Sequence, residues 1–171
     1  KGIYIMNDAY CEQLVARKAK PIDVVIRFLV VFVIIAVAFF GMPFIGFLAI
    51  FVAVLLGVLA FYFVLPRLNV EYEYVLLNHD MDVDAIYNQS KRKRQLSFDI
   101  QQAEIMAPAN SPRLQSYHPE KTYDFTSGCT DIKTYALMIF LDQKMTCILL
   151  EPDEKMYEHM QNWMGMKLHR D

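Results

Sequence analysis

Apolar residues fill one long stretch of the chain. Residues 28–65, thirty-eight in succession, include no charged side chain. A single helix of that length would measure about 57 Å at ~1.5 Å per residue, nearly twice the ~30 Å hydrocarbon core of a bilayer. Gly41-Met42-Pro43 interrupts the stretch, and Pro43 both disfavours helix at Met42 and lacks an N–H donor. The pattern therefore predicts two membrane-spanning helices, about 23–40 and 46–65, joined by a tight hairpin.

The segment before this stretch, residues 1–21, is interpreted as an N-terminal arm. Tyr10, Leu14 and Lys18 recur at a spacing that suits a helix. One interpretation is a short interfacial helix that lies on the membrane and ends before Pro21. The other is a frayed polar tail.

After Pro66 the hydrophobic pattern changes from helical to alternating, which is typical of β-strands. Tyr72, Tyr74 and Leu76 alternate with Glu71 and Glu73, and short polar turns separate the alternating segments that follow. The predicted strands are residues 70–77, 80–87, 95–100, 103–107, 121–126, 134–141 and 144–150.

The last predicted element is a helix from Pro152 to about Gly165. Pro152 suits the first helical position, and the acidic residues Asp153 and Glu154 suit the positive end of the helix dipole. One apolar stripe follows the helix, made of Met156, Tyr157, Met160, Trp163 and Met164. We expect this stripe to cover the end of the sheet, although a Met-rich stripe with a Trp can also mark a partner site.

Seven antiparallel strands followed by an amphipathic helix resemble the pleckstrin-homology (PH) fold. The whole chain, over about residues 7–165, resembles a family of small bacterial membrane proteins with no assigned activity, in which two spans precede a PH-like domain. The resemblance rests on four stretches: Glu71-Tyr-Glu-Tyr-Val-Leu, Asp82-Val-Asp-Ala-Ile-Tyr, Lys91-Arg-Lys-Arg-Gln-Leu-Ser-Phe-Asp-Ile and Leu149-Leu-Glu-Pro. It implies a membrane α+β protein, with a transmembrane hairpin over 22–66 and a cytoplasmic PH-like domain over 67–171. That domain would be a seven-stranded antiparallel barrel or sandwich with a C-terminal helix.

Charge is distributed unevenly between the two parts. Residues 1–69 contain six Lys/Arg and three Asp/Glu, a net charge of +3, whereas residues 70–171 contain eleven and sixteen, a net charge of −5. The acidic domain disfavours nucleic acid as a partner, because phosphate binding needs a basic face. Lys and Arg flank both spans and are absent from the hairpin turn, so the positive-inside rule places both termini in the cytoplasm.

Motifs for catalysis or metal binding do not emerge from the sequence. Asp80, Asp82 and Asp84 have the spacing of a calcium loop, but the sixth position is Ala85 and the twelfth is Lys91. The histidines lack metal-ligand spacing, the three cysteines fit free thiols in a reducing compartment, and no Gly-rich phosphate loop follows a strand. No ionisable residue lies deep in the spans, which disfavours a transporter or channel. We therefore expect neither cofactor nor metal, and no enzymatic activity.

Two groups of residues remain as candidate contact sites. Lys91, Arg92, Lys93 and Arg94 lie in a turn that should return toward the bilayer, where each basic residue contributes ~1 kcal/mol at most to binding an anionic surface. A solvated turn that acts only as a topology signal is the alternative. Ala49, Ala53 and Gly57 form a small-residue face on the second span, which suits close packing against the first span or against a second copy of the chain.

The sequence thus predicts a non-enzymatic, membrane-anchored interaction module. Such a module would dock a cytoplasmic protein or sense the anionic leaflet. The alternative is an accessory subunit that contacts a larger membrane complex through its hairpin. The expected partners are the lipid bilayer with its anionic headgroups, an unidentified protein and, in the homo-oligomer case, a second copy.

Overall fold

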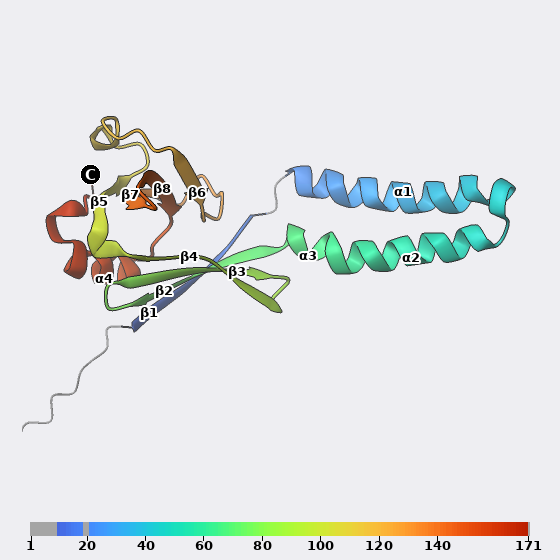
Figure 1. Ribbon diagram of the computed structural model, residues 1–171, viewed down its shortest axis with the longest axis horizontal. Helices are drawn as coiled ribbons and strands as arrows, with labels where there is room; N and C mark the ends of the chain where they lie inside the picture. The colour runs from blue at the N-terminus through green and yellow to red at the C-terminus, as the bar shows by residue number, and fades with distance from the viewer. Residues whose placement is uncertain (1–9, 19–20, 171) are drawn as a thin grey trace, which may run out of the picture. The chain divides into compact units, whose positions relative to one another are not determined.

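The computed structural model describes residues 10–18 and 21–170, apart from the side chains of 66 and 67, and contains four helices, eight strands and three short 3₁₀ turns within them (Figure 1). It divides into two compact units. The helical unit comprises residues 18–70 and 87–91, and the sheet unit comprises the chain up to Arg17, 71–86 and 92–171.

Two four-stranded sheets form the sheet unit. The first has the order β1 (Tyr10–Ala16), β2 (Val70–Leu77), β3 (Asp80–Tyr87), β4 (Lys91–Asp99). The second has the order β5 (Ala103–Pro108), β7 (Tyr135–Leu141), β8 (Lys144–Leu150), β6 (Lys121–Asp124). A C-terminal helix, α4 (Glu154–Met164), follows β8, and the 3₁₀ turns are Ile100–Gln102, Pro112–Leu114 and Gly165–Lys167.

Strand β1 replaces the helix that the spacing of Tyr10 and Leu14 predicted, so that prediction is wrong. β1 pairs antiparallel with β2, with Cα partners running from Tyr10 and Leu77 to Ala16 and Glu71. Residues four positions apart share one face of a strand as well as of a helix, so the spacing could not tell the two apart. The buried side chains Cys11 and Val15 fill the other face of β1. The domain therefore begins before the apolar stretch and not after it.

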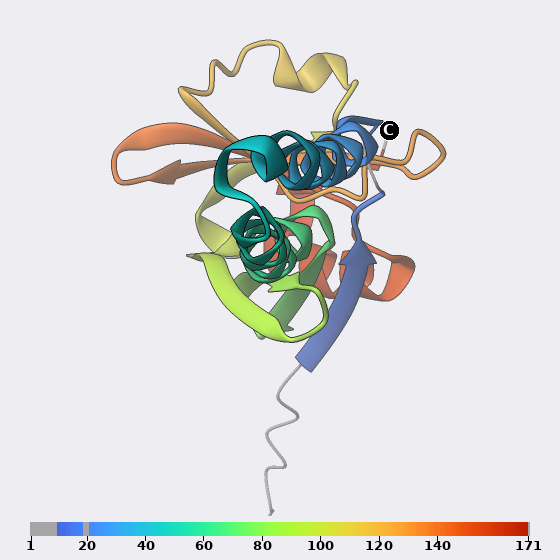
Figure 2. The same ribbon diagram turned by 90° about the vertical axis from the view of Figure 1, so that its right-hand side faces the viewer.

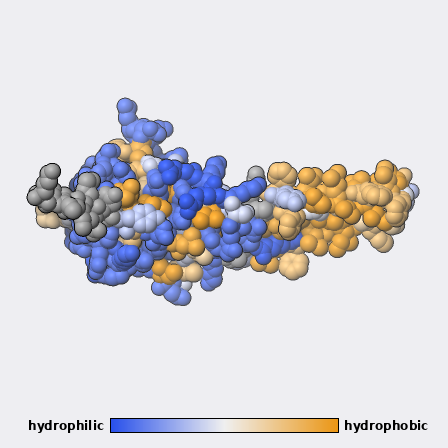
Figure 3. Space-filling model, turned by 90° about the horizontal axis from the view of Figure 1, so that it is seen from below, coloured by the Kyte–Doolittle hydropathy of each residue, from blue (hydrophilic) through white to orange (hydrophobic). Residues whose placement is uncertain are grey.

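Because β1 and β2 are neighbours, residues 17–69 form an insert in the connection between them, hereafter called the insert. Its helices are α1 (Pro21–Ile45), α2 (Leu48–Phe63) and the single turn α3 (Leu65–Leu68). α1 and α2 lie side by side in both views (Figures 1 and 2). Hydrophobic residues cover the visible face of both helices (Figure 3).

The hairpin turn lies later than predicted. α1 continues through Pro43 to Ile45, and the chain reverses at Gly46, whose φ of +59° is unfavourable for other residues. The Gly46 N–H donates to Met42 O at 2.9 Å and caps the helix. α1 is long and apolar enough to cross a membrane, while α2 is a shorter apolar helix of 16 residues.

Strands β2 to β8 lie close to their predicted positions, with two differences. β4 begins at Lys91 and not at residue 95, so the basic residues belong to a strand. β6 runs parallel to β8, so the set of eight strands is not entirely antiparallel. Two consecutive residues with positive φ lie in the three-residue turn between β3 and β4, at Asn88-Gln89, and in the two-residue turn between β7 and β8, at Asp142-Gln143. This is the turn geometry that matches the twist of a hairpin.

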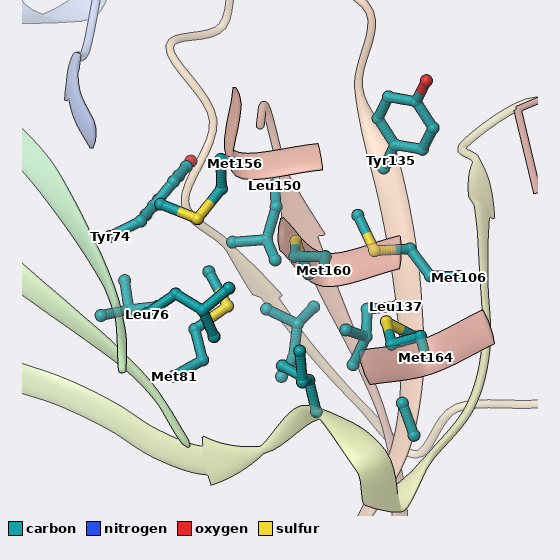
Figure 4. Close-up of a cluster of buried hydrophobic side chains, with 14 of the residues drawn as sticks. Tyr74, Leu76, Met81, Met106, Tyr135, Leu137, Leu150, Met156, Met160 and Met164 are labelled. Carbon is teal, nitrogen blue, oxygen red and sulfur yellow. The ribbon is translucent and has the colours of Figure 1, made fainter. Parts of the chain in front are cut away.

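The main core lies where both sheets meet α4. Figure 4 shows Met156 of α4 beside Tyr74 of the first sheet and Leu150 of the second, whereas Met164 lies near Leu137 and Met106 of the second sheet. The buried members of the α4 stripe are Met156, Tyr157, Met160 and Met164. Trp163 differs from them, because 36% of its surface is exposed. Its ring lies edge-on to the His79 ring, with the two ring centroids 5.7 Å apart. The expectation of a stripe that covers a sheet is confirmed for the methionines, with Trp163 at the margin.

Hydrogen bonds connect the β1–β2 pair to the segments that directly follow β6 and β8. The Tyr74 hydroxyl donates to Phe125 O at 2.5 Å and accepts from the Glu151 N–H at 3.4 Å. The Gln13 side chain donates to Glu151 O and accepts from the Asp153 N–H, each at 2.8 Å. Burial raises the pKa of the Tyr74 phenol above its ordinary value, so the neutral hydroxyl persists as a donor.

Candidate membrane-facing site

The basic segment that the sequence singled out, Lys91 to Arg94, opens strand β4. All four residues are exposed. β4 is an edge strand, since it follows β3 at the end of the first sheet. Its position on an edge leaves these long side chains free to reach either the neighbouring strands or solvent.

The two arginines of this segment are engaged with carboxylates of the same sheet. Arg92 pairs with Glu73 on β2, and its Nε lies 3.7 Å from Asp84 on β3. Arg94 Nη2 lies 2.7 Å from Asp82, and its Nε lies 3.4 Å from Asp84. The Asp84 side chain is only 7% exposed, so it needs these cations more than a surface carboxylate would.

The two lysines differ from the arginines. Neither Lys91 nor Lys93 has an acidic partner among the residues that the structure describes. Four basic residues and the three carboxylates of Glu73, Asp82 and Asp84 leave a local net charge of +1. The electrostatic potential around the segment is therefore weaker than four unpaired basic residues would produce, since oppositely charged neighbours largely cancel one another at a distance. The segment thus separates into structural arginines and free lysines.

The turn before β4 belongs to the helical unit. The Asn88 N–H donates to Asn69 O at 2.9 Å, and Asn69 directly follows α3. The Asn69 side chain in turn accepts a hydrogen bond from Arg27 Nη2 on α1 at 2.8 Å. The β3–β4 turn thus lies at the base of the insert, within the helical unit. Sequence reasoning missed the role of Asn69, because no motif marks an amide that links two distant elements.

The small-residue face of α2 packs against α1 within the chain. Ala49 and Ala53 are buried. A Cβ built on Gly41 of α1 would lie 3.0 Å from Ala49 Cβ, and one built on Gly57 would lie 3.9 Å from Ile34 Cδ1. The small side chains at Gly41 and Ala49 thus allow a close approach of the two helices.

Other reactive groups do not gather into a site. Among the described residues no three His, Cys, Asp or Glu side chains are placed to hold a metal ion. The three cysteines are free thiols, and burial raises the pKa of Cys11 and Cys147, which favours their unreactive protonated form. Asp80, Asp82 and Asp84 lie on β3, where strand alternation accounts for their spacing.

A comparison with protein families agrees with this architecture. The model of the family DUF6106, described as a bacterial PH-like domain, matches residues 7–170. The chain belongs to this family. The match covers β1 and the insert as well as the later strands, so it is not confined to the sheet unit. No curated protein and no solved structure matches the chain. The bacterial PH-like resemblance is thereby confirmed.

Proposed function

We propose that this protein is a non-enzymatic interaction module that the insert anchors in a membrane, with the sheet unit on the cytoplasmic side. In this position the module docks a cytoplasmic protein and its free lysines sense the anionic leaflet. One observation carries the proposal: the apolar insert leaves and re-enters the same sheet between adjacent strands.

That connectivity supports two membrane crossings. Ala16 and Glu71 are Cα partners, which places them about 5 Å apart. A folded sheet does not cross a bilayer, so the whole sheet would lie on one side of it. An insert that leaves this sheet and returns to it would therefore cross the bilayer an even number of times. Because α1 is apolar and long enough to span the bilayer, α2 would make the return crossing. α2 is about 24 Å long at ~1.5 Å per residue, shorter than the ~30 Å hydrocarbon core, and the uncharged residues 46–47 and 64–65 on either side would extend the return crossing.

The positions of the lysines support contact with the leaflet. The turn before Lys91 is hydrogen-bonded to Asn69 at the base of the insert, so Lys91 lies near the level where the chain enters the membrane. Neither Lys91 nor Lys93 has an acidic partner among the described residues, and an extended lysine reaches the headgroups without disturbing a core.

A labelling experiment tests the topology. A cysteine placed at Phe47, in the hairpin turn, should react with an impermeant maleimide in sealed cells, while Cys129 should react only after the membrane is opened. Cys11 and Cys147 give little background, because both are buried. Labelling of Cys129 in sealed cells would overturn the orientation.

An amine-footprinting experiment tests the leaflet contact. The full chain is reconstituted in nanodiscs of phosphatidylcholine with or without phosphatidylglycerol, and acetylation of each lysine is measured by mass spectrometry. Lys91 and Lys93 should be protected by the anionic lipid at low salt and exposed again at high salt, whereas Lys144 in the exposed β7–β8 hairpin should not change. Equal acetylation in both lipids would leave the basic segment as a topology signal only.

The alternative function, an accessory subunit of a larger membrane complex, predicts a different surface. Large apolar side chains such as Phe32, Phe39 and Phe51 are exposed on the insert and would meet either lipid or another helix. Tryptophan replacement along this face, followed by affinity purification in mild detergent, distinguishes the two functions. Partners lost through changes in the insert favour the accessory subunit, and partners lost through changes in the sheet unit favour the docking module.

A further inference from the structure

An open pocket of about 300 Å³ lies at the base of the insert, within the helical unit. Its lining has two chemical halves. Arg27, Asn69 and Asn88 supply polar groups, and Phe61 and Leu65 supply apolar surface. This division is what an amphipathic ligand needs, since one end of the ligand is charged and the other is hydrocarbon.

The polar half is held in place by its own hydrogen bonds. Asn69 accepts from Arg27 Nη2 through its side chain and from the Asn88 N–H through its main chain. A guanidinium has five N–H donors in a planar fork, and the bond to Asn69 uses one of them. Asp23, one turn earlier on α1, is buried and does not line the pocket. The pocket therefore presents a positioned cation and no carboxylate.

The depth of the pocket along the insert matches the boundary between headgroups and hydrocarbon. Arg27 immediately precedes the charge-free residues 28–65, and Leu65 is the last of them. In a bilayer, phosphate groups lie at this boundary, with acyl chains on the apolar side.

We propose that this pocket binds the phosphate headgroup of an anionic phospholipid, with Arg27 on the phosphate oxygens and an acyl chain against Phe61 and Leu65. The inference rests on the membrane anchoring proposed above and adds a specific lipid site to it. The anionic lipid would bridge α1 and the β3–β4 turn, because Arg27 and Asn88 come from those two elements.

Native mass spectrometry of the full chain, released from detergent with added lipid, tests this site. Phosphatidylglycerol should bind at least tenfold more tightly than phosphatidylcholine, and Arg27→Gln should remove most of that preference. Lys144→Gln is the matched control, because it removes one exposed positive charge from a residue that does not line the pocket. Glycerol phosphate, which has the headgroup chemistry without acyl chains, should bind at least tenfold more weakly than phosphatidylglycerol.

A second measurement applies if Arg27→Gln fails to fold. A phosphatidylglycerol with a photoreactive acyl chain should cross-link wild-type chain at Phe61 and Leu65 more often than at Phe44, which is exposed at the far end of α1. Equal loss of binding in Arg27→Gln and Lys144→Gln, or cross-links spread evenly along the insert, would overturn the site. Insertion is measured separately, as protease protection of the hairpin in the nanodiscs used for footprinting. A chain that inserts but shows no preference for phosphatidylglycerol would contradict the pocket and leave the anchoring intact.

Discussion

Two strand pairs in this protein have the same geometry and very different connections. β1–β2 and β7–β8 are both antiparallel pairs with seven Cα partners each. Asp142 and Gln143 alone join β7 to β8, whereas residues 17–69, fifty-three in all (69 − 16), join β1 to β2. A flexible connection lengthened from two to fifty-three residues would cost about 3 kcal/mol in closure entropy, at ~0.6 kcal/mol per doubling.

The insert reduces this difference because it is not flexible. α1 and α2 pack along their length, and the Arg27–Asn69 hydrogen bond joins the start of one helix to the end of the other. The two ends of the insert, which continue into β1 and β2, are thus already held close together. The comparison leads us to expect that helix packing in the insert and pairing of β1 with β2 stabilise each other.

The largest expected effect comes from separating β1 from its partner. A chain that begins at Val70 lacks Cys11, Val15 and Gln13, and so loses a whole strand of the first sheet and the side chain that binds Glu151 and Asp153. We expect this fragment to show no cooperative unfolding transition in urea and to lack near-ultraviolet circular dichroism.

A matched variant keeps β1 and removes the insert. An Asn-Gly dipeptide replaces the residues between Arg17 and Val70, because Asn-Gly is the sequence that two-residue hairpin turns prefer. This short-loop domain should be soluble without detergent and should unfold cooperatively. If it unfolds as readily as the fragment from Val70, β1 depends on the insert itself and the comparison between the two strand pairs fails.

The reverse experiment lengthens the short connection. About fourteen Gly and Ser residues placed between Asp142 and Gln143 of the short-loop domain should lower the free energy of unfolding by ~2 kcal/mol, since the loop doubles three times. The same insertion after Gln115, in a loop that is already long, should cost less than ~1 kcal/mol. Equal losses at both sites would show that chain closure is not what distinguishes the β7–β8 pair.

This comparison also explains how far the sequence predicts the structure. Alternation of apolar and charged residues located β2 and β3, because both strands are locally amphipathic. It failed for β1, where the spacing of Tyr10 and Leu14 fits a strand and a helix equally. It also failed for the direction of β6, because parallel pairing with β8 depends on a partner more than twenty residues away.

The candidate site was predictable only in part. Sequence reasoning identified the basic residues 91–94 but placed them in a turn. Net charge alone could not show which of them are paired with carboxylates. Arg92 and Arg94 are paired because the carboxylates of Glu73, Asp82 and Asp84 lie on adjacent strands. Strand order in space supplies this information, and a linear pattern of charges does not.

A smaller effect should follow from weakening the link between the two strand pairs. Tyr74→Phe removes the hydroxyl that bonds Phe125 O and the Glu151 N–H, and should lower the stability of the short-loop domain by about 1–2 kcal/mol at neutral pH. Burial raises the pKa of this phenol in the folded state, so its stabilising effect is complete below the ordinary tyrosine pKa of ~10 and declines as pH rises further.

Urea titrations of the short-loop domain between neutral pH and about pH 11 measure this decline. The wild-type domain should lose stability above about pH 10 more steeply than Tyr74→Phe. Tyr117→Phe, at a partly exposed tyrosine, should retain the wild-type slope. Parallel slopes for wild type and Tyr74→Phe would assign the alkaline loss to other groups.

The smallest effect concerns the helix packing that brings the ends of the insert together. Gly41→Ala places a methyl group 3.0 Å from Ala49 Cβ, closer than carbon atoms pack, so α1 and α2 must separate slightly. Gly57→Ala meets Ile34 Cδ1 at 3.9 Å, an ordinary contact, and replaces a poor helix former with the best one. We expect Gly41→Ala to lower stability by about 1 kcal/mol and Gly57→Ala to leave it unchanged or raise it.

Thermal unfolding of the full chain in detergent measures both variants. A single transition that includes near-ultraviolet signals of the sheet unit should move down in Gly41→Ala, because a looser insert delivers its ends to β1 and β2 less closely. A shift confined to the helices, with the sheet transition unchanged, would mean that the two units are stabilised independently. The β1–β2 pair would then owe its stability to its own packing, and residues 17–69 would act on it only as a tether.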